Sequence, residues 1–254
     1  LYEYYQRCQE YLLEPVVLNM SDTLFRMAGE RQDERMQAVA IATQLDYYYF
    51  QGTNEDSVIH YTNKVKEFAK ATHQPKYYYF AWANRLITYY LKTSKTNIAL
   101  YEVQNMLKEV QEEDDKTGLS RCYNIMSQIY TIKRFDSMAF EWRLKEIELT
   151  EKYKLENYNI SQTYAQIANY YINQKKQKEA LAAVEKAIAT ANSSTQQISA
   201  KLEFVNYYSK FGDFQAAEKL LKECQAAFEQ DKRLESIKKR LYNIESVSYT
   251  HLRA

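Results

Sequence analysis

The sequence predicts an all-α fold: an α-solenoid of about five helix-turn-helix units with capping helices at both ends. Three observations predict it. The 254-residue chain contains only 4 Gly and 2 Pro, far fewer than sheets joined by tight turns need. Hydrophobic residues make up 46% of the chain, which is enough to build a sizeable core and argues against disorder. Five of its 25 tyrosines recur at a nearly constant spacing, and such self-similarity is typical of repeat arrays.

A tyrosine marks the same position in five consecutive segments. These tyrosines lie about 40 residues apart, within the range of helical repeats. Each has a bulky apolar residue one helical turn before it and a small residue nine positions after it. The tyrosines are Tyr49, Tyr90, Tyr130, Tyr171 and Tyr208, and the small residues are Val58, Ala99, Ala139, Ala180 and Ala217. Polar, turn-like sequence lies between tyrosine and small residue, so each segment predicts two helices joined by a short turn.

The spacing has a physical reason. A helix cannot bury its apolar stripe alone, so a second helix returns alongside it. Alanine early in the second helix lets the two approach closely.

The predicted helix pairs are 33–50 with 55–72, 76–92 with 96–114, 118–132 with 136–153, 158–173 with 176–192, and 196–211 with 214–230. The expected organisation is an N-terminal capping hairpin at 1–30, repeat units at 31–75, 76–116, 117–156, 157–194 and 195–231, a C-terminal capping helix at 232–246 and a tail at 247–254.

The pattern resembles the tetratricopeptide repeat (TPR) family, which places a bulky residue, a small residue, a Tyr and an Ala at these offsets. The match is best where Ile167-Ala168 precedes Tyr171 and Ala180, and again at Tyr208 and Ala217. The chain departs from the family in its longer units. It also departs beside Leu45 and Leu86, where Asp46 and Ile87 replace the small residue.

The resemblance implies a partner-binding groove lined by the first helix of each pair. Its inward positions carry over to Tyr47, Asn84, Arg85, Thr88, Arg121, Asn124, Gln128, Gln162, Asn169 and Asn206. Carboxamides can hydrogen-bond an extended peptide backbone whatever its sequence, so a protein or peptide is the expected partner. The family's carboxylate clamp uses Lys with Asn, and here only Arg85 and Arg121 could replace the Lys. The alternative is that each of these residues is simply a solvated polar position.

Other function classes lack the residues they need. A net charge of +1 argues against nucleic-acid binding, which depends on phosphate contacts. No apolar stretch is long enough to span a membrane. The three cysteines lie far apart, and His60 with Asp56 makes at best half of a metal site. We therefore expect no catalytic residues, no metal and no cofactor, and hence no enzyme within this segment.

The stretch from Lys76 to Asn84, with Tyr89-Tyr90-Leu91 after it, resembles the N-terminal repeat region of Bacteroidales-type sensor histidine kinases. The resemblance implies the sensory region of a two-component signal-transduction protein with a kinase beyond this segment. A periplasmic location is then favoured over a cytoplasmic one, and a homodimer stays open. The alternatives are a free-standing cytoplasmic TPR adaptor and a glycan-binding helical-repeat surface protein, the latter because parts of the runs Tyr47–Tyr49 and Tyr77–Tyr79 must face a groove or solvent.

The two ends of the chain look unlike those of an intact protein. The sequence begins at Leu1 rather than Met and enters a helical pattern at once, so we interpret it as a fragment. The closing residues Ser248–Ala254 look like translated adapter sequence. We therefore treat this tail as non-native and assign no function to His251 within it.

Overall fold

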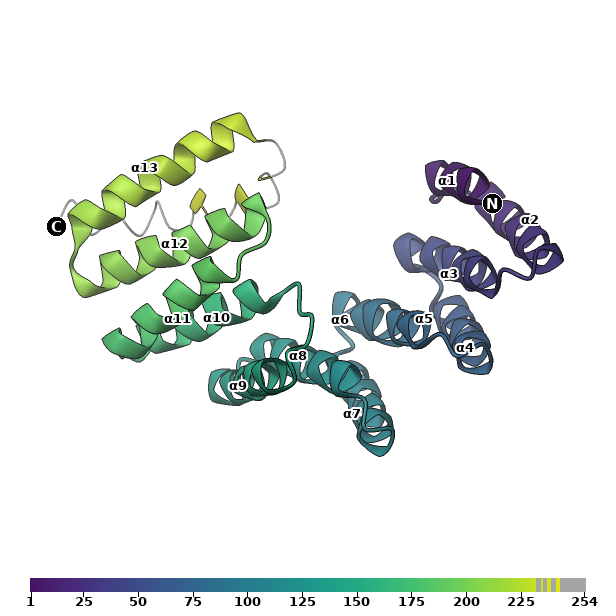
Figure 1. Cartoon of the computed structure of the whole chain (residues 1–254), viewed down its shortest axis with the longest axis horizontal. Coiled ribbons are helices and arrows are strands. Elements are labelled where there is room, and N and C mark those ends of the chain that lie inside the picture. Colours follow the sequence, from purple (N-terminus) through teal and green to yellow (C-terminus); the bar gives the residue numbers. More distant parts are fainter. Residues whose placement is uncertain (232–233, 235–236, 239–240, 243–254) are drawn as a thin grey trace. The chain divides into compact units, whose positions relative to one another are not determined.

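The computed structural model describes residues 1–231, 234, 237–238 and 241–242, and every regular element among them is a helix (Figure 1). This confirms the all-α prediction. The chain divides into two compact units, residues 1–133 and residues 134–254. The tail at 247–254 and most of the predicted capping helix at 232–246 lie outside the described residues.

The first unit begins with a helical hairpin and continues with pairs of antiparallel helices. Its elements are α1 (Tyr2–Glu10), α2 (Val16–Glu30), α3 (Glu34–Gln51), α4 (Glu55–Ala71), α5 (Pro75–Tyr79), η1 (Phe80–Ile87), α6 (Thr88–Lys92), α7 (Thr96–Glu112) and α8 (Lys116–Ile132). Each helix packs on its neighbours in sequence, α2 on α3, α3 on α4, α4 on α5 and η1, and α7 on α8. The elements α5, η1 and α6 form one continuous helical run.

Within its described residues, the second unit contains helices of 13 to 18 residues. They are α9 (Asp136–Tyr153), α10 (Ile160–Asn173), α11 (Gln177–Ala189), α12 (Ser194–Phe211) and α13 (Phe214–Gln230). Helix α10 packs on α11, α12 packs on α13, and α12 also contacts α10 and α11. Across both units the helix pairs begin and end within about three residues of the predicted positions, as expected for a strongly periodic sequence.

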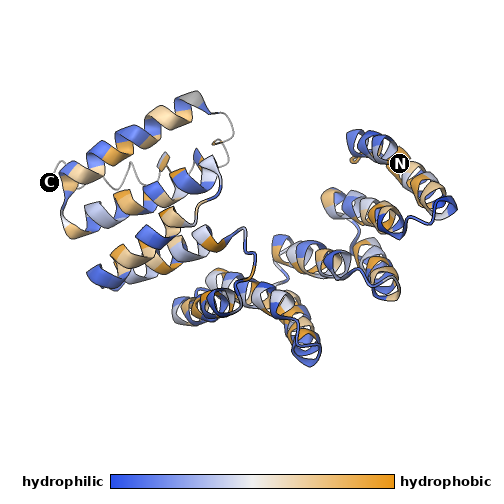
Figure 2. Cartoon of the chain, in the orientation of Figure 1, coloured by the Kyte–Doolittle hydropathy of each residue, from blue (hydrophilic) through white to orange (hydrophobic). Residues whose placement is uncertain are grey.

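The alanines that follow the tyrosine anchors belong to the core. Ala99, Ala139, Ala180 and Ala217 are all buried. Of the tyrosine anchors, Tyr49 and Tyr90 are buried and the other three are half-buried. Figure 2 shows apolar and polar residues interleaved along the helices, which is the pattern of a helix that buries one stripe and solvates the rest.

One turn conformation recurs at the ends of the helices. At the end of α4, His73 has a left-handed backbone with φ +54°, and the next amide, Gln74 N, donates to the carbonyl of Ala69 at 2.8 Å. Ser94, with φ +61°, precedes the same bond from Lys95 N to the Tyr90 carbonyl. This bond pattern is the Schellman motif, which satisfies carbonyls that the helix end leaves unpaired. The repeats are therefore joined by a common turn that needs almost no glycine.

Two further features concern membrane-spanning helices and the three cysteines. None of the helices in the described part of the chain has the length and apolarity needed to cross a bilayer. The thiols of Cys8, Cys122 and Cys224 are buried and unoxidised. Burial raises the pKa of Cys122 to about 12 and that of Cys224 to about 11, which leaves both as protonated, apolar core residues near neutral pH.

Candidate functional site

The candidate site is built around η1, the π-helical segment within the run 75–92. A π-helix has a wider turn than an α-helix and advances the register of the side chains that follow it. The hydroxyl of Thr88 donates to the carbonyl of Ala83 at 3.0 Å. This carbonyl lies five residues back, which fits the wider π-helical turn. The predicted groove residues Asn84, Arg85 and Thr88 all lie in or directly after this segment.

Arg85 is held by one carboxylate and by aromatic rings. Its Nε donates to Asp46 Oδ1 of α3 at 2.5 Å, and both side chains are largely shielded, at 17% and 15% exposure. The guanidinium carbon lies 4.3 Å from the ring centroid of Phe80 and 4.8 Å from that of Tyr49, within the range of cation–π attraction. Burial raises the pKa of Asp46, although the hydrogen bond and charge of Arg85 act in the opposite direction.

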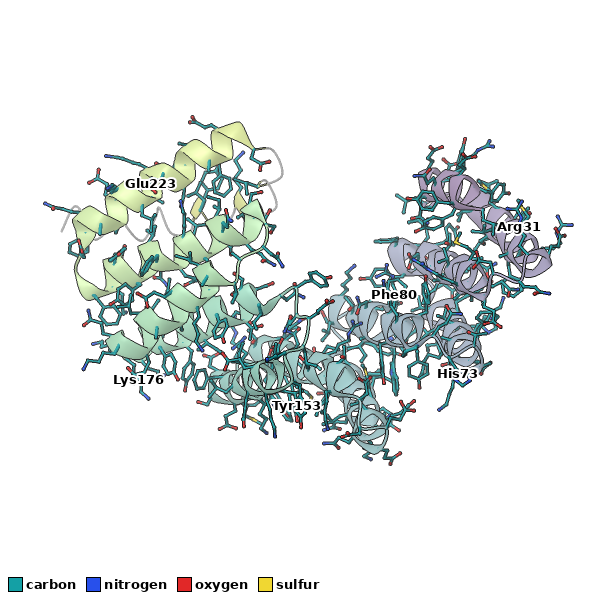
Figure 3. The ribbon with its side chains drawn as sticks, viewed as in Figure 1. Arg31, His73, Phe80, Tyr153, Lys176 and Glu223 are labelled. Atoms are coloured by element: carbon teal, nitrogen blue, oxygen red, sulfur yellow. The ribbon has the colours of Figure 1, made fainter. Side chains whose placement is uncertain are left out.

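A cavity of about 360 Å³ lies beside this pair, and we call it the Arg85 pocket. It is lined from three elements by Tyr5 of α1, by Asp46 of α3, and by Lys76, Tyr77, Phe80 and Arg85 of the run 75–92. Phe80 is labelled in Figure 3. The pocket thus combines three aromatic rings with an arginine–aspartate pair and one further cation.

Lys76 differs from Arg85 because it is exposed and its ammonium has no hydrogen bond or ion pair within the described part of the chain. Asp46 compensates the charge of Arg85, so Lys76 gives the pocket a net positive charge. Tyr5 and Asp46 interact, since burial and then the nearby Asp46 carboxylate raise the pKa of the Tyr5 hydroxyl.

The structure joins several of the predicted groove residues of the first unit. The Nη1 of Arg85 donates to the backbone carbonyl of Asn84 at 3.0 Å, and the Asn84 side-chain oxygen accepts from Nη1 of Arg121 on α8 at 3.2 Å. One helical turn along α8, Gln128 Nε2 donates to Asn124 Oδ1 at 2.6 Å. The first unit therefore carries a continuous polar connection from Asp46 through Arg85 and Asn84 to Arg121.

Tyr47 lies elsewhere. Its half-buried ring packs edge-on against Tyr48, with centroids 5.0 Å apart, and also against the core of the N-terminal hairpin around Cys8 and Val17. It does not line the Arg85 pocket. The structure therefore gives Tyr47 a packing role between α3 and the first two helices.

In the second unit two of the three predicted residues contact a buried acid. Asn169 of α10 and Asn206 of α12 each direct Nδ2 to Oε2 of Glu203, at 3.4 and 3.5 Å. Glu203 is only 4% exposed. Gln162 is exposed on α10. Two of the carboxamides thus support a buried carboxylate between helices, as buried charges require.

Sequence reasoning missed the residues that complete each group. Tyr5, Lys76, Tyr77 and Phe80 come from outside the family's inward positions, because they line the pocket from α1 and from the start of the run 75–92. Glu203 was missed because, beside Lys201 and Asn206, it reads as an ordinary solvated position of the helix. Its spacing three residues before Asn206, on the same helix face, was the available signal.

No arrangement for metal binding occurs in the described residues. No group of three His, Cys, Asp or Glu side chains there could hold an ion. His60 is exposed, with its ring 5.0 Å from that of Tyr61 in an edge-on arrangement.

Comparisons with known proteins place the fold. No family model matches the chain, and no curated sequence matches it significantly. Among solved structures, BtubC (BKLC) from P. vanneervenii is similar with a TM-score of 0.66 and 13% identity, over 87% of this chain and 91% of that one. A Podosopora anserina putative kinesin light chain with TPR-like repeats gives 0.56 and 15%, over 79% and 97%.

A Rap protein complexed with Competence and Sporulation Factor gives a TM-score of 0.55 and 13% identity, over 98% of this chain and 75% of that one. At these identities the similarity concerns the fold. The chain has the fold of TPR-like helical-repeat proteins.

Proposed function

We propose that residues 1–133 bind an extended peptide or a segment of a partner protein, and that the Arg85 pocket anchors it. The pocket itself carries the proposal, because it places three aromatic rings and the unpaired Lys76 around one cavity of about 360 Å³. Ligand sites are typically concave and mostly apolar, with a few polar groups that fix orientation. The TPR-like fold supports the assignment, since such repeat arrays form extended binding surfaces.

The residues of the pocket define the expected ligand. An apolar or aromatic side chain fits between Tyr5, Tyr77 and Phe80. An acidic group beside it would pair with Lys76, whereas Arg85 is already compensated by Asp46 and mainly shapes the wall. The exposed Asn84 side chain can hydrogen-bond the backbone of a bound segment. A Rap protein of similar fold was solved with a bound factor, which supports partner binding by an array of this kind.

The test is peptide selection followed by a charge reversal. Phage-displayed peptides would be selected on the full chain, and the best one measured by fluorescence anisotropy. We expect an aromatic residue next to an acidic one, and we expect Lys76→Glu to weaken binding on the order of tenfold because attraction becomes repulsion. Lys108→Glu is the matched control. Lys108 is an exposed residue of α7 outside the pocket, and its substitution changes the net charge of the chain by the same amount.

Equal effects of the two substitutions would contradict the proposal. So would a selected peptide that lacks both features. Retention of the chain by immobilised oligosaccharides, together with a failed peptide selection, would favour the glycan-binding alternative instead.

We also propose that this binding unit serves as the sensory region of a two-component histidine kinase, positioned outside the cytoplasm. The support is the sequence resemblance of the stretch 76–91. A homodimer would then be the natural signalling unit, because a bound partner could change its packing. The gene sequence beyond residue 246 tests this: a membrane helix and a kinase box would support it, and a stop codon would favour a free-standing adaptor.

A further inference from the structure

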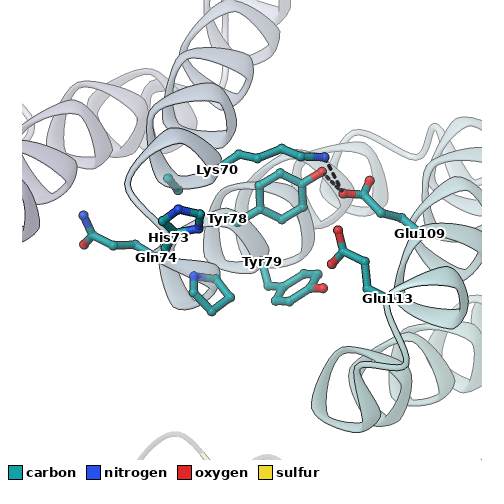
Figure 4. Close-up of a pocket in the computed structure, with 9 residues that line it drawn as sticks. Lys70, His73, Gln74, Tyr78, Tyr79, Glu109 and Glu113 are labelled. Carbon is teal, nitrogen blue, oxygen red and sulfur yellow. Dashed lines mark hydrogen bonds and ion pairs between the residues drawn. The ribbon is translucent and has the colours of Figure 1, made fainter.

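A second cavity lies on another side of the run 75–92, between α4, α5 and α7. It has a volume of about 210 Å³. Figure 4 shows Glu109 of α7 and Glu113, which directly follows α7, reaching toward Tyr78 and Tyr79, with His73 on the opposite side. None of the residues lining this cavity also lines the Arg85 pocket.

The two carboxylates differ in how well they are compensated. Glu109 Oε1 accepts a hydrogen bond from the Tyr78 hydroxyl at 2.5 Å and lies 3.8 Å from Lys70 Nζ. Glu113 is exposed at the rim, and its carboxylate has no hydrogen bond or ion pair within the described residues. Since Lys70 is 69% exposed and its contact is long, it screens Glu109 only weakly. The ammonium of Lys66 on α4 is also close enough to Glu109 to interact with its charge. Glu113 is therefore the carboxylate of this cavity that has no cationic partner among the described residues.

The remaining walls suit an organic cation rather than a metal ion. Ala69 and Pro75 provide apolar surface, and the two tyrosines provide ring faces and edges. Aromatic rings attract ammonium groups through their negative faces. Nearby, Lys66 of α4 already places its ammonium 3.2 Å from the ring centroid of Trp82 and 5.1 Å from that of Tyr78. This part of the fold therefore already holds a cation against aromatic rings.

The pKa values of the two tyrosine hydroxyls also depend on the nearby carboxylates. Burial raises the pKa of Tyr78 and of Tyr79 far above the ordinary value. For both, further increases come from hydrogen-bonded carboxylates, Glu109 and Asp115 respectively, and from Glu113. Only the part of these increases that comes from the carboxylates favours a cation at the cavity, because burial disfavours a charge of either sign.

From this geometry we infer that the cavity between α4, α5 and α7 binds a primary alkylammonium group, with the aliphatic stem against Ala69, Pro75 and Tyr79 and the ammonium at Glu113. The group could belong to a free amine or to a lysine side chain of a polypeptide. The site is separate from the Arg85 pocket, so its occupancy does not depend on the function proposed for that pocket.

The test uses n-pentylamine as the probe and 1-pentanol as its uncharged counterpart, titrated into the full chain and followed by NMR. Pentylammonium should bind with a dissociation constant on the order of millimolar, as befits six heavy atoms. It should shift the ring signals of Tyr78 and Tyr79, whereas pentanol should bind at least several-fold more weakly.

Two matched variants test whether the carboxylate of Glu113 binds the ammonium group. Glu113→Gln should weaken pentylammonium binding by about tenfold, the effect of losing one charge-assisted contact. Glu112→Gln removes the same charge from the adjacent exposed residue, which does not line the cavity, and should change binding little. Equal losses in the two variants, or equal binding of pentanol and pentylammonium, would overturn the inference.

The source of the cation is decided by a further arm with Nα-acetyl-lysine amide. Binding of this probe with the same dependence on Glu113 supports recognition of a lysine side chain in a partner polypeptide. Binding of pentylammonium alone supports recognition of a free amine, because the backbone of the lysine probe would then be excluded.

Discussion

At the scale of single residues, the Asp46–Arg85 pair is the best-defined electrostatic feature of the Arg85 pocket. Burial raises the pKa of Asp46 more than Arg85 lowers it. The folded chain therefore binds the Asp46 proton more tightly than the unfolded chain does. The stability that this group contributes is fully present below its unfolded-state pKa and is lost as pH rises through the folded-state value.

We predict that the Asp46 carboxyl carbon, followed by NMR, titrates above the ordinary aspartate value. Arg85→Leu should move the midpoint higher still, because both influences that lower the pKa come from Arg85 while burial persists. Lys76→Leu is the control and should change the midpoint much less. A midpoint at or below the ordinary value in the unsubstituted chain would show that Arg85 outweighs burial.

At the scale of helices, periodicity predicted where each element begins and ends, but it did not predict how the chain turns between them. The Schellman turns use Gln32, His73, Ser94, Asp114 and Lys175 at positive φ, residues that carry no glycine signal in the sequence. The π-helical segment Phe80–Ile87 was also hidden, because an extra residue in one turn leaves the apolar pattern of so short a stretch nearly unchanged.

These turns give a testable asymmetry between two positions. Gly212 has φ +88°, and a Cβ added there would touch nothing within 4 Å, so Gly212→Ala should destabilise only through the backbone, by about 1 kcal/mol. Ser94 has φ +61° and is exposed. Ser94→Gly should stabilise by about 0.5 kcal/mol, since relief of backbone strain exceeds the entropy cost of glycine.

Urea denaturation of both variants measures the two effects. Opposite shifts of the unfolding midpoint at unchanged slope are expected. A loss of stability in Ser94→Gly would mean that the serine side chain contributes more to this turn than its exposed position indicates.

At the scale of the whole chain, the sequence predicted the fold class but only part of the candidate site. The repeat indicated which residues share a helix face, and the structure has Asn84 in η1 and Arg121 in α8. The repeat did not predict which side chains contact each other across helices. Contacts such as Arg85 with Asp46 and Asn169 with Glu203 depend on how the helices pack, and the spacing of residues along the sequence does not specify that packing.

The repeat architecture also predicts how the chain unfolds. In an array, each helix pair contacts mainly its neighbours, so a local loss of packing should stay local. Leu202 on α12 is fully buried in the cluster it shares with α13, together with Val205, Leu221 and Cys224. Leu202→Ala should cost about 2–5 kcal/mol there.

Hydrogen exchange of the amides measures how far this loss spreads. We expect Leu202→Ala to speed exchange in α12 and α13, by roughly two orders of magnitude where protection is highest, because each 1.4 kcal/mol is a tenfold change in the opening equilibrium. The amides of α3 and α4, around Leu45 and Val58, should keep their protection. Equal acceleration in both sets would show that the chain opens as one cooperative body, and the nearest-neighbour description of this array would then be wrong.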